Sequence, residues 1–270
     1  MNIFNLELLK ARQDRAKALG SSTHIDKFVV DQAHARLSEI NRKFNDVAIV
    51  GGKACFWAKH LGINNAHLVA DEEKLNLKCG AYELIIHALS LHWYNDPVGQ
   101  LIQLRNALTT DGLMLAFLFG GNTLCELRTA FQRSEMRNDN GMSPRVAPMA
   151  ELRDAGDLLV RAGFALSVAD SIDLAVSYST PLALLYDLRR MGETNIMVGR
   201  RKNFLKRNTL KECMEIYSRD FYEKDDQERI KATFQIFCLT GWAPSENQQK
   251  PLRPGTAKKK LSDALNSNKF

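Results

Sequence analysis

The stretch FNDVAIVGGKACFWAKHLGINNAHLVADEE, residues 44–73, decides the expected fold. Its DVAIV run is short, apolar and β-branched, as expected of a buried strand, and Gly51-Gly52 ends that run. KACFWAKHLG then has helical spacing, with Gly62 where a helix C-cap would lie. A second short strand, AHLVAD, follows. This order is typical of the opening of a nucleotide-binding α/β fold.

The alternation continues along the chain. AYELIIHALSL is a nearly continuous apolar run and predicts a strand that is buried on both faces. PVGQLIQLRNAL predicts a helix with Pro97 near its start, and DGLMLAFLFGG predicts a fourth strand entered through an Asp111-Gly112 turn. We therefore expect a mostly parallel sheet with helices on both faces.

In such a sheet, ligands bind beyond the carboxyl ends of the strands. The expected strand ends are Val50–Gly52, Ala70–Glu72, Ser90–Trp93 and Phe119–Asn122. We also expect Val47–Val50 and Leu84–Leu89 to be neighbouring strands near the centre of the sheet.

The sequence suggests four segments. They are an N-terminal helical segment (1–43), a Rossmann-like core (44–137), a C-terminal part that completes the sheet and caps the substrate (138–252), and a basic tail (253–270). Within the third segment we expect a helix that begins at Met149 and is closed by Gly163, helices around 181–191 and at 209–222, and a strand over 230–242.

The composition is that of an ordinary globular protein, with 45% apolar and 25% charged residues and a net charge of +6. We expect no membrane span and no secretory signal, because no long unbroken apolar run occurs. The basic stretches lack interleaved aromatic residues, so a nucleic-acid partner is not expected. The five cysteines are scattered, which predicts free thiols in a reducing cytoplasm and no zinc site. The oligomeric state is left open.

A resemblance to a known family becomes specific at LSLHWYNDPVGQLIQLRNALTTDGLMLAFLFGGNTLCELR. It extends through GMSPRVAP, LLVRAGF, DLRRMGETN and TGWAPSENQQKPLRPGTAKKKL. These sequence motifs resemble those of the type-11 class I S-adenosylmethionine-dependent methyltransferases. Within them, the chain is similar to a group that contains the malonyl-acyl-carrier-protein methyltransferase of biotin synthesis and a mitochondrial complex I assembly factor described as an arginine hydroxylase.

The chain departs from the pattern of this family at two places. Ile49 stands where the first strand usually ends in aspartate, and of the three glycines of the turn only Gly51 is present, with Lys53 and Cys55 at the other two positions. Between Leu61 and Leu68 the chain is too short for the usual second strand and helix, so we expect one βα unit, and the acid that holds the ribose, to be missing.

The resemblance nevertheless implies a site for S-adenosylmethionine, and the two departures predict that its affinity is weakened. The residues expected to bind this cofactor are Gly51, Gly52, Asp71, Glu72, Ala88 and Ser90. Those expected at the substrate pocket are His92, Trp93 and Arg128. No catalytic residue is assigned and no metal is expected.

Several of these residues have a structural alternative. His92 is a general base or a polar cap on a buried strand, and Arg128 binds substrate or forms a surface pair with Glu126. Lys53 binds an anion or fills the space of a lost cofactor.

The leading hypothesis is therefore a methyltransferase with an unknown small-molecule or protein acceptor. The alternatives are modification of a protein arginine, implied only by the resemblance, and a non-catalytic assembly factor that has kept the fold.

Overall fold

The computed structural model describes residues 2–139, 141–226 and 228–249. The expected basic tail, 253–270, lies outside the described residues. The α-helices are α1 (Leu6–Ala18), α2 (His24–Glu39), α3 (Ala54–Leu61), α4 (Pro97–Ala107), α5 (Cys125–Asn138), α6 (Leu152–Arg161), α7 (Pro181–Met191) and α8 (Arg207–Asp220). The strands are β1 (Val47–Val50), β2 (His67–Val69), β3 (Tyr82–His87), β4 (Leu108–Phe119), β5 (Ala165–Tyr178) and β6 (Ile230–Trp242).

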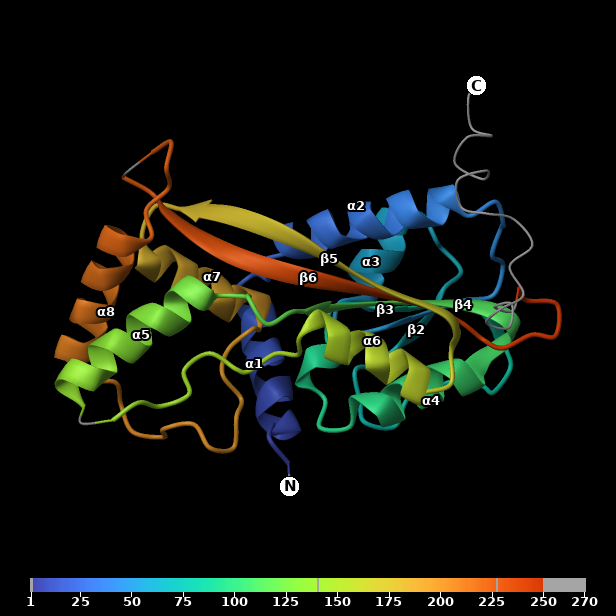
Figure 1. Ribbon diagram of the computed structural model, residues 1–270, viewed down its shortest axis with the longest axis horizontal. Helices are drawn as coiled ribbons and strands as arrows, with labels where there is room; N and C mark the ends of the chain where they lie inside the picture. The colour runs from blue at the N-terminus through green and yellow to red at the C-terminus, as the bar shows by residue number, and fades with distance from the viewer. Residues whose placement is uncertain (1, 140, 227, 250–270) are drawn as a thin grey trace, which may run out of the picture.

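All six strands join in one sheet in the order β2-β1-β3-β4-β6-β5. The first four strands in this order are parallel to one another, whereas β6 is antiparallel to both of its neighbours. β1 pairs with β3 in the interior of the sheet, with Val47 opposite Leu84 and Val50 opposite His87. The predicted pair of central strands is confirmed, and the fold is the Rossmann-like α/β class expected (Figure 1).

The predicted loss of one βα unit agrees with the sheet. Only a short connection separates the end of α3 at Leu61 from β2, and β2 pairs directly with β1. β2 therefore lies at the edge of the sheet and has just three residues.

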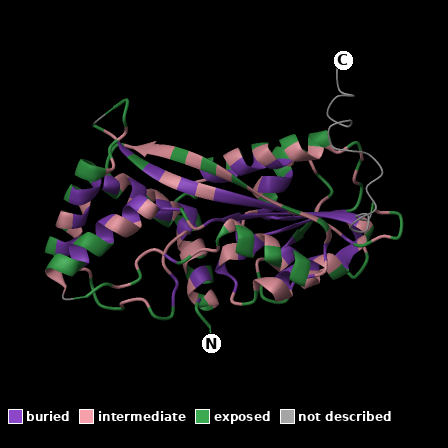
Figure 2. Ribbon diagram, viewed as in Figure 1, coloured by how far each residue is buried: buried purple, intermediate pink, exposed green. Residues whose placement is uncertain are grey.

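Three predictions about strands need correction. The third strand ends at His87 rather than Leu89, because Leu89 has a φ of 52° and a 3-10 turn follows at Leu91–Trp93. The fourth begins at Leu108, so that the Asp111-Gly112 turn is an irregularity within β4. β5 was not expected at all: it is an edge strand without fully buried residues (Figure 2), so it lacks the apolar run that marked the others.

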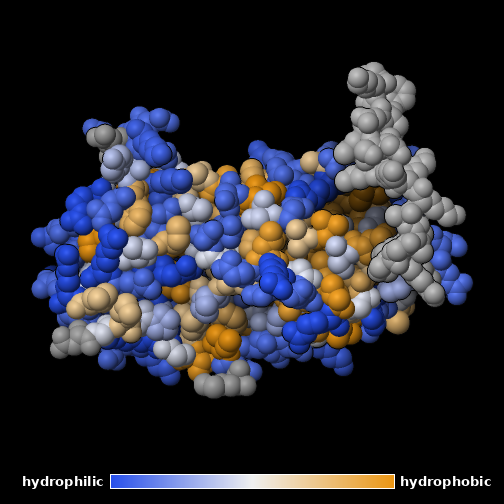
Figure 3. All heavy atoms as spheres, in the orientation of Figure 1, coloured by the Kyte–Doolittle hydropathy of each residue, from blue (hydrophilic) through white to orange (hydrophobic). Residues whose placement is uncertain are grey.

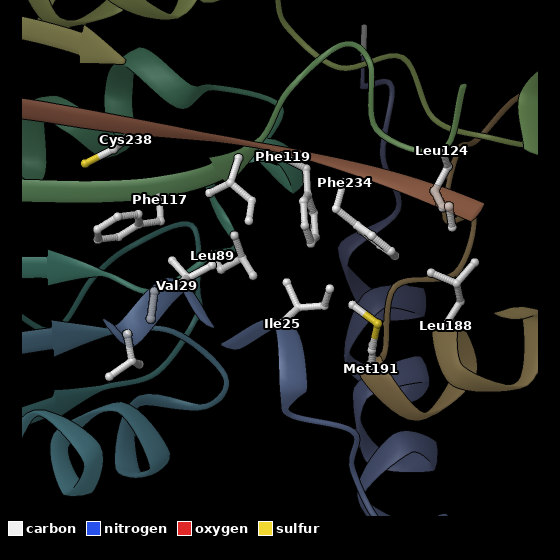
Figure 4. Packing of buried hydrophobic residues seen from close by; sticks show 14 of the residues in the cluster. Ile25, Val29, Leu89, Phe117, Phe119, Leu124, Leu188, Met191, Phe234 and Cys238 are labelled. Atoms are coloured by element: carbon white, nitrogen blue, oxygen red, sulfur yellow. The ribbon is translucent and has the colours of Figure 1, made fainter. Parts of the chain in front are cut away.

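Helices cover both faces of the sheet (Figure 1). α2 and α3 pack on one face, and α4 and α6 pack on the other. Figure 4 shows α2 side chains Ile25 and Val29 in the same core as Phe119 of β4, Phe234 of β6 and Met191 of α7.

Helices α5 and α8 lie against each other at the end of the fold where β6 begins. The surface at that end is mainly hydrophilic (Figure 3). α1 lies against α7, so the N-terminal helices pack directly on the rest of the fold. No helix in the described ranges is both long and apolar enough to cross a membrane.

Candidate functional site

The carboxyl ends of β1 and β3 bring the glycine turn next to residues 88–90. The amide of Ala88 donates to the carbonyl of Val50 at 2.8 Å. Gly51 has a φ of 148°, and a Cβ there would lie 3.0 Å from both the Cβ and the carbonyl oxygen of Ala88. Glycine is thus required at Gly51 by the packing of the two strand ends, before any ligand is considered.

A cavity of about 510 Å³ opens beside this turn and is bordered by Gly51, Gly52, Asp71 and Tyr94. Acidic side chains dominate its charged lining, with Glu7, Asp14, Asp71, Glu72 and Glu73 against two lysines. The volume lies within the range of small-molecule sites. An acidic cavity of this size favours a ligand that carries donors or positive charge.

Asp71 is held rigidly at the wall of this cavity, which we name the acidic cavity. Its Oδ1 accepts hydrogen bonds from Ser90 Oγ at 2.9 Å and from the hydroxyl of Tyr94 at 2.5 Å. Its Oδ2 is buried and has no hydrogen-bond partner in the described part of the chain. A buried acceptor without a donor is costly, so Oδ2 is suited to a donor supplied by a ligand.

Two further titratable side chains lie close to Asp71. Burial raises the pKa of Tyr94, and the charge of Asp71 raises it further. Burial lowers the pKa of His87 to about 4, only partly offset by Asp71. Both ring nitrogens of His87 are buried without a partner among the described residues, so this histidine is neutral at physiological pH. His87 was not singled out from the sequence because it lies within an apolar run.

Helix α1 covers the glycine turn. A Cβ added at Gly52 would meet the amide group of Gln13 at 3.4 Å. Gln13 and Lys17 border the acidic cavity and also a smaller niche of about 50 Å³ that is lined by Lys53 and residues 88–90. The niche has room for little more than a water molecule while α1 lies in this position.

Lys53 turns toward the second helix. Its Nζ lies 2.5 Å from Oδ2 of Asp26 and 3.2 Å from the carbonyl oxygen of Ser22. Asp26 is buried, and its Oδ1 accepts from the indole of Trp57 at 3.3 Å. The anion that Lys53 binds is thus a side chain of the protein itself, although the stem of Lys53 still lines the niche.

His92 and Trp93 both point to Glu193, which directly follows the C-cap of α7. Glu193 Oε2 accepts from Trp93 Nε1 at 2.8 Å and lies 3.2 Å from His92 Nε2. The His92 side chain is therefore buried and positions Glu193. Glu193 lines both the niche and a large cavity of about 510 Å³ on the other side. It was missed from the sequence, although it stands within the family word DLRRMGETN.

Arg128 lies apart from His92 and Trp93, in a neighbouring cleft of about 450 Å³. Its guanidinium donates to the carbonyl oxygens of Gly121 and Thr123 at 3.2 and 3.3 Å. Glu126 instead accepts from the amide of Thr233 at 3.2 Å. The expected surface pair of Glu126 with Arg128 is wrong, because Glu126 is buried against β6.

The predicted site residues therefore fall into three groups. Those expected to bind the cofactor gather at the glycine turn and the acidic cavity. His92 and Trp93 lie one step away, around Glu193, and Arg128 lines the separate cleft. Among the described residues, no group of three His, Cys, Asp or Glu is arranged to hold a metal ion.

Comparisons with known proteins give relatives over most of the chain. The mitochondrial arginine-hydroxylase NDUFAF5 of Danio rerio is 31% identical over 97% of this chain and 89% of its own length. The protein of the same name from Dictyostelium discoideum is 39% identical over 70% of this chain. A malonyl-[acyl-carrier protein] O-methyltransferase of Laribacter hongkongensis is 30% identical over 70% of this chain. The matches span only 43% of the Dictyostelium protein and 61% of the Laribacter protein.

Among solved structures, a putative methyltransferase from Bacillus halodurans matches with a TM-score of 0.49 and 13% identity, over 78% of this chain and 99% of that one. No protein-family profile matches the chain.

Proposed function

Because the chain belongs to the class I methyltransferase family that includes the NDUFAF5 proteins and the malonyl-acyl-carrier-protein O-methyltransferases, we propose that it binds S-adenosylmethionine and transfers its methyl group to an acceptor. The acceptor is a small molecule or a protein.

The unpaired Oδ2 of Asp71 carries this proposal. It is buried at the wall of a cavity whose volume suits a nucleoside, directly beside the Gly51-Gly52 turn. The adenine amino group is a donor of the kind that this oxygen lacks. Ser90 and Tyr94 hold Asp71 in place for that hydrogen bond.

The residues present fit the adenosine end of the cofactor better than its methionine end. S-adenosylmethionine supplies a methyl group that its sulfonium already activates. In this chain the methionine end would have to occupy the niche, which Gln13, Lys17 and Lys53 narrow. Binding therefore requires side chains of α1 to move aside.

Glu193 connects the two sides of the proposed site. It faces the niche and the large cavity, and Trp93 and His92 fix its Oε2. A carboxylate at that junction can accept a proton from an acceptor bound in the large cavity. The proposed substrate residues are thus His92 and Trp93, acting through Glu193, with Arg128 in the adjoining cleft.

The shortened fold implies a cost in affinity. The strand that normally carries the ribose acid is missing, and each charge-assisted hydrogen bond that is lost is worth roughly 1.5–3 kcal/mol. Two such bonds correspond to a loss of about 100-fold or more.

Calorimetric titration with S-adenosylmethionine and S-adenosylhomocysteine tests the proposal. We expect saturable binding of both compounds, weaker than is usual for complete sites. If neither compound gave a heat of binding at millimolar concentration, methyl transfer would be removed from consideration. In that outcome the second candidate, a non-catalytic assembly factor with a methyltransferase fold, is favoured by the narrowed niche.

The names of several relatives supply a third candidate, modification of a protein arginine. It predicts that the large cavity accepts a guanidinium group. A cytoplasmic location stays a prediction; in agreement with the expected free thiols, all five cysteines are unpaired.

A further inference from the structure

The large cavity next to Glu193 is unusually basic. Six cationic side chains contribute to its lining, from α1, α7 and the two loops that flank them in space: Arg12, Arg145, Arg189, Arg200, Arg201 and Lys202. Among the described residues that line it, Glu193 is the one with a carboxylate. The rest of the wall is largely apolar, including Trp93, Phe119 and Phe234.

Internal partners neutralise only part of this charge. Arg145 lies 2.6 Å from the buried carboxylate of Glu135, and Arg201 lies 3.5 Å from Asp139. Arg12 and Arg189 have no carboxylate within 4 Å among the described residues. Both therefore present uncompensated charge at the cavity wall.

A third arginine, Arg15, lies close enough to Arg12 and Arg189 to be affected by the charge of each. Burial lowers the pKa of Arg15, and the neighbouring charges of Arg12 and Arg189 lower it further. The Nε atoms of Arg12 and Arg15 are buried and have no partner in the described part of the chain. Arg15 is thus repelled by two other guanidinium groups, and the buried donors without an acceptor are unfavourable unless an anion joins them.

The positions of the arginines on their helices do not remove the need for an anion. Arg15 and Arg189 lie in the last turns of α1 and α7, where the helix dipole favours a positive charge. Arg12 lies a turn earlier, and a helix dipole supplies no acceptor for a buried Nε. The cavity is the place from which an acceptor can reach the cluster.

We propose that the large cavity binds an acidic substrate group, a carboxylate or a phosphate, between Arg12 and Arg189. Guanidinium groups match such oxyanions through paired hydrogen bonds. The acidic group would lie in the large cavity, which Glu193 joins to the niche. The inference therefore rests on the proposed function, and it specifies the chemical class of the methyl acceptor. The same charge disfavours an arginine side chain as substrate.

Calorimetry on the whole chain tests this at constant ionic strength set with sodium chloride. The probes are inorganic phosphate, succinate and N-acetylargininamide, the last of which carries a guanidinium and no carboxylate. We expect saturable binding of phosphate or succinate, the better of the two identifying the oxyanion, and no binding of N-acetylargininamide.

Variants then assign the binding to the cluster. Arg12→Gln and Arg189→Gln should each weaken anion binding by about ten-fold or more, and Arg12→Lys should retain part of it. Arg153→Gln, which removes an exposed charge on α6, is the matched control and should bind as the parent does. Tryptophan fluorescence of the parent, which contains Trp93 in the cavity wall, reports the same binding independently of how well the variants fold.

Three outcomes overturn the inference. They are no saturable anion binding to the parent, equal weakening by Arg153→Gln, and preferential binding of N-acetylargininamide. Because no cofactor is present in these titrations, a failure to bind S-adenosylhomocysteine would leave the anion result standing and would count only against methyl transfer.

Discussion

The ammonium group of Lys53 lies 2.5 Å from the carboxylate of Asp26, which joins the glycine turn to the first turn of α2. In the sequence, Lys53 stands at a position of the cofactor turn that the family usually fills with glycine. In the structure it compensates a buried charge that would otherwise stand alone. In complete members of the family this turn receives a cofactor. Here the same turn also links α2 to α3, through the ion pair of Lys53 with Asp26.

Lys53→Met should therefore destabilise the fold by about 3 kcal/mol, the lower end for a broken buried pair because Lys53 is partly exposed, since a buried carboxylate loses its counter-ion. Urea unfolding measures this loss. The double variant Lys53→Met with Asp26→Asn should recover much of it, because the amide carries no charge. Equal stability of Lys53→Met and the parent would contradict the role of the pair.

Lys53→Gly carries a second expectation, which was made from the sequence and remains a prediction. Removal of the side chain widens the niche and should strengthen binding of S-adenosylmethionine. The loss of the partner of Asp26 acts against it, so binding must be compared at a temperature where both proteins are folded. Unchanged affinity in the folded variant would show that Lys53 does not obstruct the site.

Asp71→Ala should weaken binding of S-adenosylhomocysteine by roughly 1–3 kcal/mol, the cost of an unpaired donor on the ligand. Calorimetric titration gives the difference directly. Glu73→Gln is the matched control, because this exposed residue lines the same cavity and should change the affinity little. Identical binding by the Asp71 variant and the parent would remove the adenine contact.

Glu193→Ala should cost about 1–3 kcal/mol of stability, because the buried donors of Trp93 and His92 lose their shared acceptor. Glu193→Gln keeps an acceptor oxygen and should cost less. Denaturant unfolding of both variants distinguishes the two cases. If the alanine variant is as stable as the glutamine variant, the three side chains do not form a coupled unit.

His87 predicts a dependence of stability on pH. Its pKa is about 4 in the folded chain, below the usual value of 6.5, so the unfolded chain binds more protons between these values. The contribution of neutral His87 is fully present above about pH 6.5 and is lost as the pH falls towards 4, by up to about 3 kcal/mol. Stability curves of His87→Leu should be flatter than the parent over this range, whereas His60→Gln, an exposed control, should follow the parent.

The sequence predicted the parts of the fold that local patterns encode. The β-branched run before Gly51, the proline at the start of α4 and the glycine after α3 all mark elements that the structure contains. β5 was missed because its residues are half-exposed and its stability comes from pairing with β6, which follows it by some fifty residues.

The site was predictable only where strand ends define it. Asp71, Ala88 and Ser90 come together because parallel strands end at one edge. Glu193, His87 and the arginines of the large cavity could not be assigned, because their roles depend on which helix packs over which strand. No local pattern in the sequence states that α1 lies against α7.

The place of β6 in the sheet has a consequence for how the chain is made. Among the strands in the described ranges β6 is synthesised last, yet it lies between β4 and β5. Until residue 242 has left the ribosome, one edge of the long apolar strand β4 has no partner strand. Over the same period β5 has no partner strand on either edge. Such edges recruit other chains. We therefore expect that a nascent chain halted before β6 aggregates or is held by chaperones, and that this sheet is completed only after residue 242 has been translated.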